Sequence, residues 1–226
     1  IPPSAEAIAS GLFLLGVTCA IYMVWEMVRH PPQMAVMRYA WPLCALFSGP
    51  LLIWFYRRYA GPHADDAPFA AKVAKGTLHC GAGCALADLI CENLAHYVPG
   101  VLAYFGLGTI FSTEIFAVWT MDYVFALLTG IVFQYFAIAP MRDLSVGEGV
   151  MAAAKADVLS LTSWQVGMYG SMGLAHFILF PAFVGDKVDA GSPVFWAAMQ
   201  MAMLAGFASA YFPNWFLIRS GLKEEM

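Results

Sequence analysis

Carboxylates, imidazoles and thiols recur along one apolar stretch of the sequence, residues 77–98. Asp88, Glu92 and His96 are spaced by four residues, so a helix places them on one face. A second stripe overlaps the first and adds thiols: Cys80, Cys84, Asp88 and Cys91. The stretch thus offers thiols near one end, carboxylates in the middle and an imidazole near the other end, which are ligand types of transition-metal sites.

Two later apolar stretches carry the same types of side chain. Glu114 begins one of them, Asp122 lies two turns further in, and His176 lies on the other. Each ionisable group inside the hydrocarbon layer costs at least ~2.5–3.5 kcal/mol on insertion scales, so it needs a partner or a purpose. No Lys or Arg occurs between Lys75 and Arg142. The acids in this interval therefore have no basic residue nearby in the sequence to neutralise them.

These residues predict two groups of metal ligands. The outer group combines carboxylates and imidazoles, which suit copper, zinc and iron: Glu92, His96, Glu114, Asp122 and His176. The inner group is softer and suits Cu(I) or zinc: His79, Cys80 and Cys84. Asp88 lies between the two groups along the stripe. We therefore expect a transition-metal ion bound within a helix bundle, with transport, delivery or storage by stepwise exchange between these ligands.

The same residue types leave other functions open. A membrane oxidase or monooxygenase would hold a reactive copper or iron centre with these ligands, and an apolar cavity beside the metal would favour it. A polar path that continues past the metal would favour transport. In a structural subunit of a larger membrane complex, the buried acids would be protonated. In a protein with a proton site, the same acids would bind and release protons. Haem between His96 and His176 is a minor alternative.

Composition indicates the class of protein. Only 12% of the 226 residues are charged and 61% are hydrophobic, whereas a soluble domain carries about 25% charged residues. These values exclude a soluble globular protein and a disordered chain, and the net charge of −4 argues against a nucleic-acid binder. We expect an all-α, multi-pass protein in a lipid bilayer, with one transmembrane domain over residues 1–226. Its assembly is left open between a homo-oligomer and a larger membrane complex.

Six apolar segments have about the length that a helix needs to cross a bilayer, roughly 20 residues: Ala7–Val28, Tyr39–Tyr56, Thr77–Val98, Ile115–Ala139, Thr162–Val184 and Val194–Ile218. The shorter segment Pro99–Thr113 is loosened by glycines, and we expect it to be broken or re-entrant. Within Ser145–Leu161, apolar side chains recur at helical spacing and polar side chains fall elsewhere, which predicts an amphipathic helix on the cytoplasmic face. The apolar residues are Val150, Ala154, Val158 and Leu161, and the polar ones are Glu148, Lys155 and Asp157.

The orientation follows from the loops that hold Lys and Arg, because these residues favour the cytoplasmic side. With six crossings, most basic residues lie on one side: Arg57, Arg58, Lys72, Lys75, Arg142, Lys155, Arg219 and Lys223. Arg29, Arg38 and Lys187 lie on the other side. This distribution predicts that both ends of the chain are cytoplasmic.

Three segments resemble a bacterial integral-membrane family known as a domain of unknown function: Thr77–Asp88, Lys155–Gly170 and Asn214–Lys223. The resemblance spans about the second to the sixth predicted helix, and the stretch from His79 to Cys84 is its most distinctive feature. It implies a location in the bacterial inner membrane. It implies no activity and no cofactor.

Overall fold

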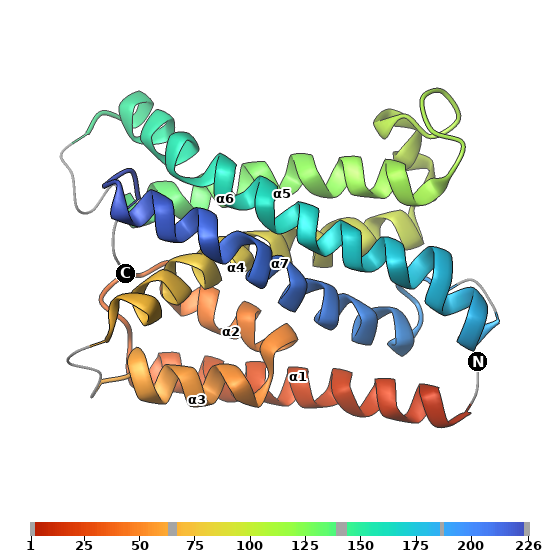
Figure 1. Cartoon of the computed structure of the whole chain (residues 1–226), viewed down its shortest axis with the longest axis horizontal. Coiled ribbons are helices and arrows are strands. Elements are labelled where there is room, and N and C mark those ends of the chain that lie inside the picture. Colours follow the sequence, from red (N-terminus) through yellow and green to blue (C-terminus); the bar gives the residue numbers. More distant parts are fainter. Residues whose placement is uncertain (1–2, 63–66, 139–143, 186–187, 224–226) are drawn as a thin grey trace.

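The computed structural model describes residues 3–62, 67–138, 144–185 and 188–223, which form a bundle of helices. In chain order the elements are α1 (Pro3–Arg29), α2 (Met37–Ser48), α3 (Pro50–Tyr59), α4 (Phe69–Tyr97), η1 (Pro99–Phe105), α5 (Glu114–Ile138), α6 (Val146–Leu174), η2 (Ala175–Val184) and α7 (Pro193–Arg219). η1 is a 3-10 helix, and η2 is a π-helix that continues α6. The long helices run along the length of the bundle (Figure 1). The all-α prediction is confirmed for the described residues.

Four helical stretches are long and apolar enough to cross a membrane: α1, α5, α6 with η2, and α7. Large apolar side chains are exposed on each of them, as contact with lipid requires. α4 is as long, but it carries the acids and histidines described above. It packs against α2, α5, α6 and α7. These neighbours shield its polar residues from lipid.

The predicted crossing at Tyr39–Tyr56 is wrong, because this segment folds as a hairpin of two short helices. α2 ends at Ser48 and α3 begins at Pro50. Between them Gly49 has a φ of +54°, a conformation that favours glycine. Pro50 cannot continue α2, because it lacks an N–H and its ring clashes with the preceding turn, but it fits the first turn of α3.

Contacts with α1 show how far the hairpin reaches into the bundle. Its tip lies against the middle of α1, where Gly16 is next to the carbonyl of Leu46. Gln200 of α7 donates a hydrogen bond of 2.7 Å to the same carbonyl. At the other end of the hairpin, Arg57 donates a hydrogen bond of 2.8 Å to the hydroxyl of Tyr22. The hairpin therefore enters the bundle and leaves it at the same end (Figure 1).

This hairpin changes the topology. α1 begins at one end of the bundle and α7 ends at the other (Figure 1), so the prediction that both ends of the chain lie on one side does not fit the structure. The described Lys and Arg residues all lie in the half of the bundle where α7 ends: Arg29, Arg38, Arg57, Arg58, Lys72, Lys75, Lys155, Arg219 and Lys223. We call this end the basic end. Arg142 and Lys187 lie outside the described residues.

Residues 145–161 do not form a separate amphipathic helix. A capping box of Ser145 and Glu148 starts α6, which runs unbroken into η2. Val158, part of the predicted apolar face, is exposed, whereas Asp157 is buried. The predicted apolar and polar faces are therefore not kept in the structure, because Leu161 is buried and Lys155 is exposed.

The segment Pro99–Thr113 consists of η1 followed by turns and bends. η1 is followed by turns in which Gly106 and Gly108 have φ values of +94° and +81°. Leu102 is fully buried, and η1 packs against α4 and α5. The segment therefore covers the end of the bundle where α4 ends and α5 begins.

Glycines let α4 and α7 approach the buried ring of Trp164 on α6. A Cβ atom at Gly206 would lie 2.7 Å from the nearest atom of the indole ring. We expect Gly206→Ala to lower the free energy of unfolding by about 1–3 kcal/mol through overpacking. Gly170→Ala on α6 is the control, since a Cβ atom there meets nothing within 4 Å. Equal unfolding midpoints of the two variants in detergent would contradict this packing.

Candidate functional site

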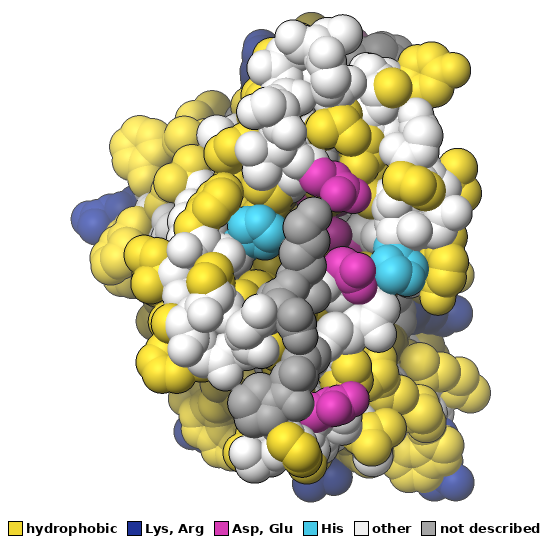
Figure 2. Space-filling model, turned by 90° about the vertical axis from the view of Figure 1, so that its right-hand side faces the viewer, with side chains coloured by type: hydrophobic (Ala, Val, Ile, Leu, Met, Phe, Trp, Pro, Cys, Tyr) yellow, Lys and Arg dark blue, Asp and Glu magenta, His cyan; other side chains and the backbone are white. Residues whose placement is uncertain are grey.

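An open pocket of about 660 Å³ lies where α4 ends and α5 begins, and we call this the pocket end. Its lining includes five ionisable residues from α4, α5, η2 and the loop before α7: Glu92, His96, Glu114, His176 and Asp189. Figure 2 shows Asp, Glu and His side chains gathered on this end, with the visible Lys and Arg side chains at the margin. Four of the five are residues of the predicted outer group, so the structure brings these four to one pocket.

Helix positions explain this meeting. Glu92 and His96 lie one turn apart at the end of α4, and Glu114 is the first residue of α5. Because α4 and α5 run in opposite directions, the last turns of one lie beside the first turn of the other. His176 lies near the end of the continuous stretch of α6 and η2, with its ring edge-on to Phe177 at a centroid distance of 4.9 Å. The side chains therefore reach the pocket from separate helices.

Asp189 is a pocket residue that was not among the ligands predicted from the sequence. Its Oδ1 lies 3.5 Å from Nδ1 of His96 and accepts a hydrogen bond of 2.9 Å from the N–H of Gly191. In the sequence Asp189 follows the polar residues Asp186 and Lys187, a composition typical of an ordinary solvated connection. Only the folded chain brings this loop against the end of α4.

The pocket collects ligand types without forming a complete coordination sphere. No three His, Cys, Asp or Glu side chains of the described ranges lie close enough together to hold a metal ion. Glu92 is 8% exposed at the inner wall, whereas His96 and Glu114 are exposed at the rim. The inner wall and the rim thus present separate ligands.

Two carboxylates are buried behind the pocket. Asp88 on α4 is 2% exposed and Asp122 on α5 is 1% exposed. The carboxylate of Asp88 has no hydrogen-bond partner among the described residues, and that of Asp122 lies beside the thiol of Cys91. Glu92 interacts electrostatically with Glu114 on the pocket side and with both buried acids on the inner side. Glu92 thus connects the pocket to the interior. Asp122, which was predicted in the outer group, lies behind the pocket and does not line it.

The predicted inner ligands are not held as one metal-binding group. Cys80 and Cys84 are buried neighbours on α4, whereas the ring of His79 packs against Phe133 of α5 at a centroid distance of 5.9 Å. Because successive residues of a helix point in different directions, the side chain of His79 diverges from that of Cys80.

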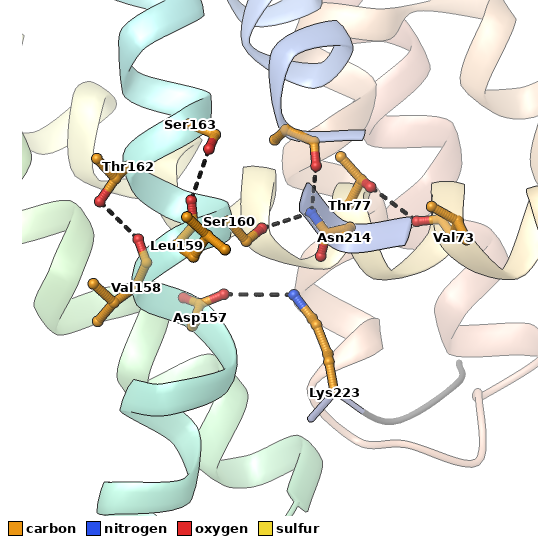
Figure 3. Close-up of polar contacts among 11 residues, drawn as sticks. Val73, Thr77, Asp157, Val158, Leu159, Ser160, Thr162, Ser163, Asn214 and Lys223 are labelled. Carbon is orange, nitrogen blue, oxygen red and sulfur yellow. Dashed lines mark hydrogen bonds and ion pairs between the residues drawn. The ribbon is translucent and has the colours of Figure 1, made fainter. Parts of the chain in front are cut away.

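A second polar group lies nearer the basic end. Nζ of Lys223, in the turn after α7, lies 3.6 Å from Oδ1 of Asp157 on α6, and the two side chains are 0% and 2% exposed (Figure 3). Beside them the amide of Asn214 donates a hydrogen bond of 2.6 Å to the hydroxyl of Ser160. We call four buried residues of this region the inner cluster: His79, Gln134, Asp157 and Lys223.

Sequence reasoning assigned most of this region to the surface. Lys223 was counted as a loop charge because it follows the last apolar segment, and Asp157 was placed on the polar face of a surface helix. A usable signal was present in Asn214, a polar amide inside an apolar segment. Ser160 and Asp157 lie one turn apart on α6. With Asn214 they are polar residues close to or within apolar segments, which is the kind of signal that identified Asp88.

In comparisons with known proteins, the family model described as a domain of unknown function (DUF4396) matches residues 71–223. This region contains most of α4 and all of α5, α6 and α7, with the pocket residues and the inner cluster. α1, α2 and α3 lie outside the match. No curated protein and no solved structure matches the chain.

The buried ion pair can be tested by a double-mutant cycle. Lys223→Met leaves the carboxylate of Asp157 buried without its partner, so we expect a loss of about 3–5 kcal/mol in unfolding free energy. Asp157→Asn should cost a similar amount, because it leaves a buried ammonium. The double variant Asp157→Asn/Lys223→Met should be more stable than either single variant. Additive losses in detergent unfolding would show that the two charges do not interact.

Proposed function

Since the chain belongs to the DUF4396 family of domains of unknown function, we propose its function from the geometry of its own residues. We propose that it binds a transition-metal ion (zinc, iron or copper) in the pocket and carries this ion across the membrane. The path leads from the pocket through Glu92 to the buried carboxylates of α4 and α5.

The pocket supplies suitable ligands for entry. Imidazole nitrogens and carboxylate oxygens bind zinc, iron and copper, and both types come from α4, α5 and η2. His96 and Glu114 are exposed, and exposed side chains change rotamer within picoseconds to nanoseconds. A metal ion at Glu92 can therefore draw these two rim ligands toward itself.

The buried carboxylates are the observation that carries the proposal. An acid within the hydrocarbon layer is expensive and normally has a partner or a function. Asp88 and Asp122 are almost fully buried, and no described Lys or Arg pairs with them. Helix packing alone does not require these two charges. A passing cation would be stabilised by each carboxylate in turn.

The distribution of basic residues supports an orientation. All described Lys and Arg residues lie at the basic end, which we therefore place in the cytoplasm. The pocket then opens on the outer side of a bacterial inner membrane, and the metal ion enters from outside. α1 begins on the outer side in this arrangement.

A metal-dependent oxidase or monooxygenase is the second candidate. Trp119, Met172 and Phe195 line the same pocket, so an organic substrate would find an apolar wall beside the ion. The row of carboxylates beyond Glu92 has no evident use in such an enzyme. Transport accounts for both the pocket and the buried acids.

Removal of two pocket ligands tests entry. We expect Glu92→Gln/His96→Ala to weaken Zn²⁺ binding by at least about tenfold, which corresponds to ~1.4 kcal/mol, because the inner-wall and rim ligands of α4 are lost together. Isothermal titration calorimetry of the detergent-solubilised protein measures the change.

A matched control lies at the basic end. Glu26 and His30 have the same spacing as Glu92 and His96 and lie 3.1 Å apart, but they are outside the pocket. Glu26→Gln/His30→Ala should leave Zn²⁺ affinity unchanged. An equal loss of Zn²⁺ affinity in both double variants would refute the pocket as the entry site. It would also be refuted if neither the unmodified protein nor the control variant bound Zn²⁺ stoichiometrically.

Removal of the buried acids tests passage separately from entry. Asp88→Asn/Asp122→Asn keeps the shape of both side chains and removes their charge. We expect Zn²⁺ uptake into protein-containing vesicles to fall at least about tenfold, while Zn²⁺ binding at the pocket persists. Unchanged uptake would show that the ion does not pass these carboxylates.

A further inference from the structure

Lys223 holds an ammonium group inside the bundle on a short turn. α7 ends at Arg219, and Gly221, with a φ of +72°, redirects the chain. The N–H of Lys223 then donates a hydrogen bond of 3.1 Å to the carbonyl of Leu217. The side chain points toward Asp157 of α6 (Figure 3). A movement of this one turn would withdraw the ammonium and leave the helices in place.

His79 and Gln134 lie near the level of the ion pair. The carboxylate of Asp157 lies against Gly130 of α5, and the backbone of Gly130 packs against Gly83 of α4. α4 and α5 run in opposite directions, and His79 and Gln134 each lie one turn from these glycines toward the basic end. The imidazole also interacts electrostatically with the buried ammonium. The inner cluster therefore occupies one region of the bundle.

The polar atoms of the inner cluster lack hydrogen-bond partners within the described chain. This holds for both ring nitrogens of His79, both amide atoms of Gln134, both oxygens of Asp157 and Nζ of Lys223. By contrast, the amide nitrogen of the neighbouring Asn214 donates hydrogen bonds to Ser160 and to the carbonyl of Ala210, although its Oδ1 has no partner among the described residues. Buried polar groups are normally hydrogen-bonded, and buried ion pairs need such bonds to offset desolvation. The ion pair is thus poorly fitted for a purely structural role.

The same atoms are suitable ligands for a metal ion. Carboxylate oxygen, imidazole nitrogen and amide oxygen all donate electron pairs to cations. Cys84 interacts electrostatically with Asp88 toward the pocket and with Asp157 toward the basic end. The inner cluster therefore continues the row of buried groups that begins at Glu92.

We infer that His79, Gln134 and Asp157 form an inner metal-binding site, and that Lys223 is a tethered cation that occupies it until a metal ion takes its place. Metal binding and withdrawal of Lys223 are then one event. The physiological identity of the ion rests on the proposed function, but the existence of the site does not. Co²⁺ is a suitable probe, because it accepts nitrogen and oxygen ligands and its visible absorption reports them.

Removal of the tethered cation should make the site available. In a Glu92→Gln/His96→Ala background, which removes two of the five ionisable pocket side chains, we expect the Lys223→Met protein to bind one more Co²⁺ per chain than the protein that keeps Lys223. Adding Asp157→Asn should abolish this ion, and Lys223→Arg, which keeps the positive charge, should not gain it. Equilibrium dialysis and visible absorption measure binding. A folded Lys223→Met protein without the additional Co²⁺, or with one that survives Asp157→Asn, overturns the inference.

A second measurement uses the unmodified protein and does not depend on how the variants fold. Without metal, we expect Lys223 to react with an amine-specific reagent at least about tenfold more slowly than the exposed Lys155, because a buried amine reacts only through local opening. Saturating Co²⁺ should raise the labelling of Lys223 several-fold and leave that of Lys155 unchanged, as read by mass spectrometry. Labelling of Lys223 that Co²⁺ does not change overturns the inference.

The two proposals fail in different ways. If the unmodified protein binds no metal at the pocket but Lys223→Met binds one Co²⁺ that depends on Asp157, the proposed function fails and the inner site stands. If the pocket binds metal and Lys223→Met adds no ion, the inner site alone fails.

Discussion

Carboxylates inside a hydrocarbon layer must be shielded from lipid, and this constraint explains the arrangement around α4. α4 carries Asp88 and Glu92, so other helices have to surround it, and α2, α5, α6 and α7 do so. Their backbones come close enough only where side chains are small, as where Gly83 meets Gly130 and where Gly81 meets the ring of Trp164. The apolar outer faces of α1, α5, α6 and α7 are the other half of the same arrangement. A polar central helix thus lies inside a layer of helices with apolar outer faces, an arrangement compatible with a lipid bilayer.

Much of this could be predicted from residue type and spacing, because a helix has a fixed rise per residue and places ionisable groups at defined depths. That regularity is why Glu92, His96, Glu114 and His176 could be assigned to one end before the fold was known. Hydropathy alone could not show that residues 39–56 fold back on themselves, because a continuous apolar run has the same composition whether it is straight or broken. The decisive detail was local, a glycine with positive φ followed by proline. The positions of Asp189 and Lys223 could not be predicted either, because both residues lie in turns whose course depends on how the helices pack.

The two ends of the molecule have opposite character. The pocket end gathers carboxylates and imidazoles, whereas the described Lys and Arg residues lie at the basic end. Between the ends lie buried acids of two kinds: Asp88 and Asp122, which have no described Lys or Arg partner, and Asp157, which pairs with Lys223. All of these groups lie in the region that matches the family, residues 71–223. Outside this region, α2 packs against α4 and α7, α1 packs against α7, and α1, α2 and α3 contribute no residue to the pocket or to the inner cluster.

The tip of the α2–α3 hairpin depends on a residue that the ribosome adds much later. The carbonyl of Leu46 accepts its hydrogen bond from Gln200, which is separated from it by 154 positions in the chain. A backbone carbonyl without a partner is costly at membrane depth, where no water can replace the missing donor. During synthesis this carbonyl lacks its Gln200 donor until α7 has been made and has packed against the hairpin. The last helix thus completes the first part of the fold, and a chain that stops before Gln200 leaves that part unfinished.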